Sequence, residues 1–330
     1  MRSLRIVRKA TGVVVNHFGN NRASVPIKPD FGLLLQNRTK ICRLIVLPHL
    51  RPFPFVITHY DRRGPAWRGL PLVMPLTKMQ LHFKESGQGR VVILLHGLFG
   101  SSDNWQPIVL RLAESFRVLA LDQRNHGQSP HSAEMDYPLM AADVDRFFAA
   151  QGLDRALVMG HSMGGKTAMQ LALDFPHRVE KLVVGDMAPR AYAPAHDRIL
   201  AALLALDLSW YQTRAQIEDV LAPEIPNPVL RRFLLKNLGR NSAGAFFWKI
   251  NLRDIARNYW RLREPVAGGT PFSGPALFIR GGRSDYLQPG DEPLLRECFP
   301  AAEIRTMPEA GHWLHADQPE EFLRLVLDFL

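Results

Sequence analysis

The residue of this sequence best suited to chemistry is a serine with a glycine two positions away on each side. Ser162 lies in the segment GHSMG, residues 160–164, a G-x-S-x-G pattern. Where a strand turns sharply into a helix, the two chain segments approach so closely that these flanking positions require glycine. The turn exposes the hydroxyl, and the first amides of the helix point at the group that the hydroxyl attacks. The pattern therefore predicts that Ser162 is a nucleophile on such a turn, a nucleophile elbow.

The base that activates this serine is expected from a histidine near the end of the chain. A serine hydroxyl is a weak nucleophile until a base removes its proton, and in α/β folds with this pattern the histidine comes last. His312 lies in AGHW, residues 310–313, a glycine-containing loop between the last predicted strand and the last predicted helix. His312 is the predicted base, and His315 is a spare or a structural histidine. His177 lies too far from the expected turn, at the end of the helix that follows it, and His196 lies at the start of the predicted helical insertion.

Two carboxylates compete to orient the histidine. Asp285 follows the predicted strand 276–280 after a short turn, GGRSD, which is where the orienting acid of such sites usually lies. Asp186 ends the strand that follows the elbow, and either residue could reach a histidine loop from a strand end. The sequence favours Asp285 as the acid, with Asp186 otherwise supporting the loop by hydrogen bonds.

The negative charge that develops on an attacked carbonyl oxygen needs two preset donors. One is expected to be the backbone amide of Met163, directly after the nucleophile. The other is expected from HGLF, residues 96–99, which follows the apolar run 91–95, and the Leu98 amide is the best candidate. His96 is interpreted as a brace of this loop rather than as an acid or base.

The same stretch also satisfies a phosphate-binding pattern. GHSMGGKT, residues 160–167, matches G-x-x-x-x-G-K-[ST], and LVVGD, residues 182–186, resembles the acidic strand end that binds magnesium in nucleotide-binding proteins. This alternative function leaves the His-Gly pair, the GGRSD turn and the AGHW loop without a role. A phosphate loop also normally follows an early strand, so the hydrolase interpretation is favoured.

The elements that must position these residues alternate between strand and helix from Met79 onward. Alternation of this kind predicts an α/β fold with a mostly parallel, doubly wound sheet. The predicted strands cover residues 80–85, 91–95, 117–121, 155–159, 180–185, 276–280 and 302–306, and the predicted helices cover residues 103–116, 137–151 and 319–330.

The alternation stops between residues 188 and 272, where helical patterns follow one another. An all-helical insertion at this point predicts a cap over the active site, because ligands of open α/β sheets bind at the carboxyl ends of the strands. Its aromatic residues are expected mostly to pack the cap's own core, with the rest lining an apolar crevice. The predicted cap helices cover residues 197–209, 214–221, 229–238 and 246–262, and the aromatics are Phe233, Phe246, Phe247, Trp248, Tyr259 and Trp260.

Charge is distributed unevenly along the 330 residues. The net charge is +10, yet residues 1–77 contain 13 Lys and Arg with only two acidic residues, which leaves residues 78–330 at −1. The predicted catalytic part is therefore nearly neutral, and no nucleic-acid partner is expected. No run of eighteen apolar residues occurs, so no membrane span is expected either.

Residues 1–78 are interpreted as a basic, poorly ordered N-terminal extension. Three explanations compete: a translated stretch upstream of a start at Met74 or Met79, an arginine-rich targeting peptide, or an additional domain. The sequence has two cysteines, Cys42 and Cys298, far apart in the chain, which fits a reducing compartment. The expected location is the cytoplasm, or the mitochondrial matrix if the extension is a transit peptide.

Several sequence blocks together resemble the YbfF-type esterases of the α/β-hydrolase fold, whose mitochondrial relatives are abhydrolase-domain proteins. The resemblance covers about residues 79–330 and implies a serine hydrolase without cofactor or metal, acting through an acyl-enzyme on small acyl esters or acyl thioesters. It implies Ser162 as the nucleophile and His312 as the base. It also keeps Asp186 open as the acid, because the DMAP segment recurs in that family and the position of Asp285 is not always acidic there. The blocks are HGLFGSSDNW, DQRNHGQSP, GHSMGGKTAM, LVVGDMAP, FLLKNL, ALFIRGG and AGHWLHAD.

Overall fold

The computed structural model describes residues 79–266 and 268–330 in full and, before Met79, only the backbone of five strands. The chain divides into two compact units, residues 1–78 and 79–330. The predictions of poor order and of a targeting peptide fall on residues 1–78 and lie outside the described residues. The five strands form two antiparallel sheets, one of β1 (Arg5–Lys9) and β2 (Gly12–Asn16), and one of β3 (Leu33–Asn37), β4 (Lys40–Val46) and β5 (Phe55–Tyr60).

The second unit is built on a seven-stranded sheet with the order β14-β13-β10-β9-β7-β8-β6. All neighbouring strands pair in parallel except β6, which pairs antiparallel with β8 at one edge. The predicted fold class is confirmed. The strands are β6 (Phe83–Ser86), β7 (Val91–Leu95), β8 (Arg117–Leu121), β9 (Ala156–His161), β10 (Val179–Gly185), β13 (Ala276–Gly281) and β14 (Ala302–Met307).

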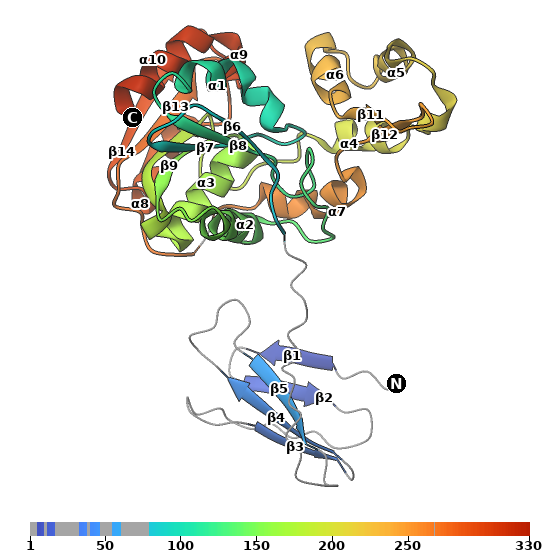
Figure 1. Cartoon of the computed structure of the whole chain (residues 1–330), viewed down its shortest axis with the longest axis vertical. Helices are drawn as coiled ribbons and strands as arrows, with labels where there is room; N and C mark the ends of the chain where they lie inside the picture. The colour runs from blue at the N-terminus through green and yellow to red at the C-terminus, as the bar shows by residue number, and fades with distance from the viewer. Residues whose placement is uncertain are drawn as a thin grey trace. The chain divides into compact units, whose positions relative to one another are not determined.

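Helices cover both faces of this sheet, as the layers in Figure 1 show. The strands can be apolar along their whole length because both faces are buried, and the last four residues of β7 are all buried. One face is covered by α1 (Gln106–Leu112), α9 (Leu314–Asp317) and α10 (Pro319–Phe329), and the other by α2 (Tyr137–Ala150), α3 (Met163–Asp174) and α8 (Glu292–Cys298).

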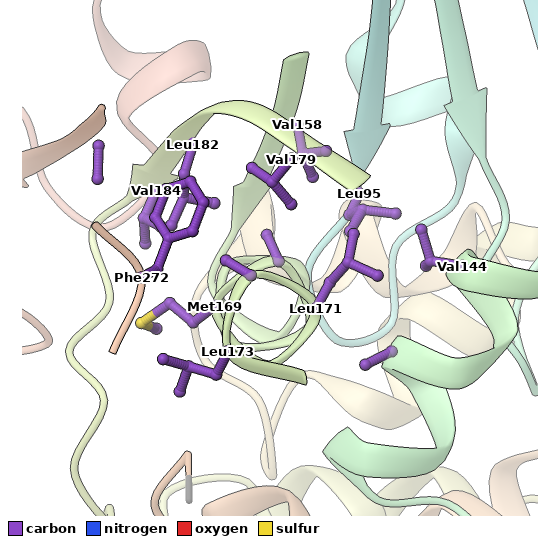
Figure 2. Packing of buried hydrophobic residues seen from close by; sticks show 14 of the residues in the cluster. Leu95, Val144, Val158, Met169, Leu171, Leu173, Val179, Leu182, Val184 and Phe272 are labelled. Atoms are coloured by element: carbon purple, nitrogen blue, oxygen red, sulfur yellow. The ribbon is translucent and has the colours of Figure 1, made fainter. Parts of the chain in front are cut away.

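Helix α3 lies at the centre of its layer, and every residue from Met163 to Leu173 is buried. Figure 2 shows its side chains between the sheet and α2, which hold the helix on both sides. A helix buried in this way cannot shift without opening the core, so the turn at its amino end is held firmly. The labelled residues belong to one buried cluster, which contains Met169, Leu171 and Leu173 of α3 together with Leu95, Val144, Val158, Val179, Leu182, Val184 and Phe272.

Most predicted elements agree with the structure to within a few residues, and β7 and β8 agree at both ends. The helix predicted for residues 103–116 is shorter in the structure. A 3-10 turn over Ser102–Trp105 precedes α1, and α1 ends at Leu112. Pro107 fits the first turn of α1, where its missing N–H is not needed. Helix α8 was not predicted from the sequence.

The insertion between β10 and β13 is not all-helical, which corrects the prediction. Residues 246–262 do not form one helix: β12 (Phe246–Trp248) pairs with β11 (Leu238–Arg240), and α7 begins only at Leu252. The reason is local, because the Asn241 carboxamide accepts the amides of Ala243 and Ala245 and so makes a hairpin turn. The helices of the cap are α4 (Asp197–Leu204), α5 (Arg214–Leu221), α6 (Pro228–Leu235) and α7 (Leu252–Arg263).

Side-chain caps define where the cap helices start. Thr213 accepts the amide of Gln216 at α5, Asn227 accepts two amides at α6, and Asn251 accepts the amide of Asp254 at α7. The buried faces of these helices form a core that also includes Phe99 of the main domain. In the described part of the chain, no helix has the length and apolar character needed to cross a membrane.

Candidate active site

Strand β9 and helix α3 meet at Ser162, which adopts φ 54° and ψ −120°. Positive φ is costly for a residue with a side chain and is found where the surrounding structure enforces it. A Cβ at Gly160 would lie 2.1 Å from the Gly164 carbonyl oxygen, and one at Gly164 would lie 2.1 Å from the Leu95 carbonyl oxygen. The structure therefore has the sharp strand-to-helix turn that the spacing of the glycines predicts.

The imidazole of His312 contacts a buried carboxylate. Its Nδ1 lies 2.7 Å from Oδ2 of Asp186, whose side chain is fully buried. A carboxylate can only accept a hydrogen bond, so Nδ1 carries the hydrogen and donates it. The Nε2 of the neutral ring is then left unprotonated and able to take a proton.

Asp186 is held in place from several directions. Its Oδ1 accepts the amide of Gly281 at 3.0 Å, and its Oδ2 also accepts the hydroxyl of Ser284. The backbone of Asp186 has φ 44°, a left-handed conformation that aspartate tolerates better than most residues. These contacts come from the end of the neighbouring strand β13, so the sheet itself fixes the acid.

Asp285, which the sequence favoured as the partner of the histidine, does not contact His312. It is exposed, and its backbone carbonyl accepts a hydrogen bond from Arg190 at 3.0 Å. Both acids follow adjacent strands, so both lie at the correct edge of the sheet. The turn after β13, however, directs Ser284 toward Asp186 and leaves Asp285 on the outside.

Two residues that the sequence analysis did not single out hold His312. The carbonyl oxygen of His312 accepts a hydrogen bond from Nε2 of His161 at 2.7 Å. The ring of Tyr286 stacks on the imidazole, with the centroids 3.8 Å apart and the planes 20° apart. His161 directly precedes Ser162 and Tyr286 directly follows Asp285. This position next to a predicted site residue is the one sequence signal that could have indicated them.

The other histidines near His312 are kept neutral. Burial, followed by repulsion from His312, lowers the pKa of His161 well below its ordinary value and lowers the pKa of His196 and of His315 to about 4. A neighbouring imidazolium would oppose the uptake of a proton by His312. The site avoids that repulsion because its neighbours stay uncharged.

The two amides proposed to hold a developing negative charge are both unused by the described residues. Neither the Leu98 amide nor the Met163 amide donates a hydrogen bond there, whereas the adjacent Phe99 amide is bound to Nε2 of His126 at 3.2 Å. His96 braces this loop, because its Nδ1 donates to the Gly97 carbonyl at 2.8 Å and its Nε2 accepts the Gln123 amide at 3.0 Å.

A cavity of about 820 Å³ opens over these residues. Ser162 and His312 both line it, although no hydrogen bond joins their side chains in the described structure. Catalytic hydrogen bonds of unliganded enzymes are often long and tighten when substrate binds. The wall is mainly apolar and includes Phe99, Trp105, Ile199, Leu230, Phe233 and Trp313.

The residues of the phosphate-binding pattern are engaged elsewhere. Lys166 is fully buried and donates to the Glu264 carbonyl at 2.6 Å, between the rings of Tyr137 and Tyr192. The Thr167 hydroxyl donates to the Met163 carbonyl at 3.1 Å within the helix. Neither side chain is arranged to hold a phosphate or its magnesium ion, so the structure gives the nucleotide-binding alternative no support.

Four of the six aromatic residues predicted for the cap lie in its core or line a cavity. Phe246 is buried in the core of the cap, and Trp248 packs against that core. Phe233 lines the large cavity, and Tyr259 lines a second, smaller one. Phe247 and Trp260 are exposed, which neither explanation predicted.

Comparison with known proteins places the chain among ester hydrolases. The model of the alpha/beta hydrolase fold matches residues 90–222. The sn-1-specific diacylglycerol lipase ABHD11 of Mus musculus is 38% identical over 247 residues, which cover 72% of this chain and 80% of that protein. Esterase YbfF of Escherichia coli (strain K12) is 35% identical over 243 residues, which cover 72% and 92% of the two chains. Among solved structures, a marine microorganism esterase is 44% identical and has a TM-score of 0.75, covering 76% of this chain and 100% of its own.

Proposed function

Because this chain belongs to the α/β-hydrolase family, as a YbfF-type carboxylic ester hydrolase, we propose that Ser162, His312 and Asp186 are its catalytic triad and that it acts through an acyl-enzyme. One observation carries the proposal. The imidazole of His312 donates to a buried carboxylate and lines the same cavity as a serine on a strained turn. This is the set of groups that activates a serine hydroxyl.

In the proposed mechanism, Nε2 of His312 removes the proton of the Ser162 hydroxyl as its oxygen attacks the ester carbonyl. The resulting imidazolium is stabilised by Asp186, which keeps its own hydrogen bonds to Gly281 and Ser284 throughout. His312 then gives the proton to the leaving alcohol, and the acyl group remains on the serine. Water, deprotonated by the same histidine, releases the acid and restores the enzyme.

The amides of Leu98 and Met163 are proposed to bind the oxyanion of each tetrahedral intermediate. Met163 is the first residue of α3, so its amide has no acceptor within the helix and lies at the positive end of the helix dipole. Removing one such donor from a hydrolase typically costs about a hundredfold or more in rate.

The proposed substrates are acyl esters with an apolar portion, and acyl thioesters belong to the same class of reaction. The apolar wall of the large cavity supports this choice. The diacylglycerol lipase and esterase names of the relatives also support an ester of this kind.

Replacement of the nucleophile tests the scheme. In Ser162→Ala, the rate of p-nitrophenyl hexanoate hydrolysis is expected to fall at least about a thousandfold, because no hydroxyl remains to form the acyl-enzyme. The exposed Ser115 offers a matched control, and Ser115→Ala should keep the wild-type rate. Undiminished turnover by Ser162→Ala, with release of p-nitrophenol followed by absorbance, would refute the proposed triad.

A further inference from the structure

A second cavity, of about 370 Å³, also borders the nucleophile. Ser162 and Leu98 line both cavities, whereas His312 lines only the larger one. An ester bound at Ser162 therefore has two places for the groups on either side of its carbonyl. The lining of the smaller cavity includes two arginines and four tyrosines, namely Arg190, Arg263, Tyr137, Tyr192, Tyr259 and Tyr286.

Arg263, at the end of α7, is the least satisfied charge of the smaller cavity. In the described chain its guanidinium has one hydrogen bond, a long one of 3.4 Å to the Tyr192 carbonyl, and it lies 5.7 Å from the centroid of the Tyr259 ring, with no carboxylate within ion-pair distance. Its Nε is buried without any hydrogen-bond partner among the described residues. A buried donor is normally paired, and leaving it unpaired costs stability, so it is a candidate for binding a ligand.

Two further cations surround the same space. Arg190 lines the cavity and is paired with Asp291 at 2.8 Å, while its remaining nitrogens donate to the carbonyls of Ala191 and Asp285. Lys166 also lines the cavity, although its side chain is buried, and its acceptor is a carbonyl rather than a carboxylate. Burial lowers the pKa of Lys166 to about 7, so near neutral pH it contributes only part of a positive charge to the cavity.

Among the described residues, no carboxylate near the cavity pairs with Arg263. Asp285 is the one carboxylate among the described lining residues, and it is exposed at the rim. Asp291 is already used by Arg190. Glu264 offers its backbone carbonyl to Lys166, and its exposed carboxylate attracts the ammonium only weakly. The cavity that borders Ser162 therefore retains one guanidinium, that of Arg263, which no described carboxylate neutralises.

We propose that the smaller cavity is a subsite for a carboxylate of the substrate, held by Arg263 with Arg190 beside it, while the large cavity holds the apolar portion. This inference rests on the proposed function of Ser162. It narrows the substrate class from acyl esters in general to esters that carry a carboxylate. A guanidinium suits this ligand because its paired N–H groups match the two oxygens of a carboxylate.

The carboxylate could belong to the acyl group or to the leaving group, and two substrate pairs distinguish these sources. The first pair compares the mono-p-nitrophenyl ester of adipic acid with p-nitrophenyl hexanoate. The second pair compares p-carboxyphenyl hexanoate with phenyl hexanoate. In each pair the two esters differ chiefly by the carboxylate, so the ratio of their kcat/KM values isolates its effect.

In one of the two pairs, the kcat/KM of the wild-type enzyme should be at least about tenfold higher for the charged ester than for the neutral one. A charge-assisted hydrogen bond stabilises a complex by about this factor. Arg263→Gln should reduce that ratio about tenfold. Arg253 lies on the same helix α7 but is exposed and lines neither cavity, so Arg253→Gln should leave the ratio unchanged.

A preference for the neutral ester in both pairs would overturn the proposal, as would an Arg263→Gln enzyme with the wild-type ratio. Failure of the proposed function would give another result: the neutral esters, too, would not be hydrolysed in a way that depends on Ser162. Inhibition of the wild-type enzyme provides a test without a variant. Hexanoate should inhibit p-nitrophenyl hexanoate hydrolysis at a concentration at least about tenfold lower than the neutral hexanamide, and equal inhibition would count against the subsite.

Discussion

Two aspartates at the same edge of the sheet differ sharply in their surroundings. Asp186 is buried and accepts three hydrogen bonds, one of them from His312, whereas Asp285 is exposed and makes no hydrogen bond to His312. A carboxylate orients an imidazole only through a direct hydrogen bond. On this ground the triad proposed here contains Asp186.

Asparagine substitutions separate the two acids. Asp186→Asn should lower kcat about ten-thousandfold, because an amide in this position favours the wrong tautomer of His312. Asp285→Asn should lower it by less than about tenfold, because the side chain touches neither the histidine nor the serine. Steady-state kinetics on p-nitrophenyl hexanoate measure both effects. If Asp285→Asn were the more damaging change, the assignment of the acid would be reversed.

The sequence was sufficient to predict the turn at Ser162 and the loop that carries His312, because both are short, local patterns with a steric or positional cause. The acid could not be chosen in the same way. Asp186 and Asp285 both follow strand ends, and the deciding features are the left-handed backbone of Asp186 and the hydrogen bond from Ser284. Neither feature can be recognised before the two strand ends are placed side by side.

The first residue of helix α3, Met163, borders the site, and one turn later the helix carries Lys166, whose pKa is unusually low. The pKa of Lys166 is lowered to about 7 by burial and then by Arg190, against a smaller attraction from Glu264. The unfolded chain keeps a lysine pKa near 10.5. Between these two values the unfolded state binds more protons than the folded one, so stability rises with pH across this window.

Replacing this lysine should remove that pH dependence. From pH 7 to pH 9, the free energy of unfolding of the wild type should rise by about 2 kcal/mol more than that of Lys166→Met, as judged by urea denaturation. Lys84→Met, which changes an exposed lysine, should follow the wild type. If the free energy of unfolding changed with pH equally for the wild type and Lys166→Met, burial would not lower the pKa of Lys166.

The cap shows where a helical pattern misleads. Residues 246–262 are rich in aromatic and apolar residues at spacings that suit a helix, yet the first three form a strand. The turn made by the Asn241 side chain pairs this strand with β11, and the Asn251 side chain then starts α7. Local hydrogen bonds of two asparagines outweigh the pattern, and hydrophobic spacing carries no information about them.

At the scale of the whole molecule, every residue proposed for catalysis lies in the second compact unit, residues 79–330. This supports the proposal that this unit is the hydrolase and that the basic segment before it is not needed for the reaction. A chain beginning at Met79 should hydrolyse p-nitrophenyl hexanoate with kcat/KM within about threefold of the full chain. Loss of activity in a truncated chain that still unfolds cooperatively would show that the first unit contributes to the site.

The cap leaves the sheet at the end of β10 and returns at the start of β13, and these two strands are direct neighbours. Its coding segment could therefore be exchanged by recombination at two points without moving a strand. Ser162, Asp186 and His312 would stay behind in the recipient, while Arg263 and Tyr259 would travel with the insert. In this architecture, the catalytic residues can thus be retained while the substrate specificity changes with the insert.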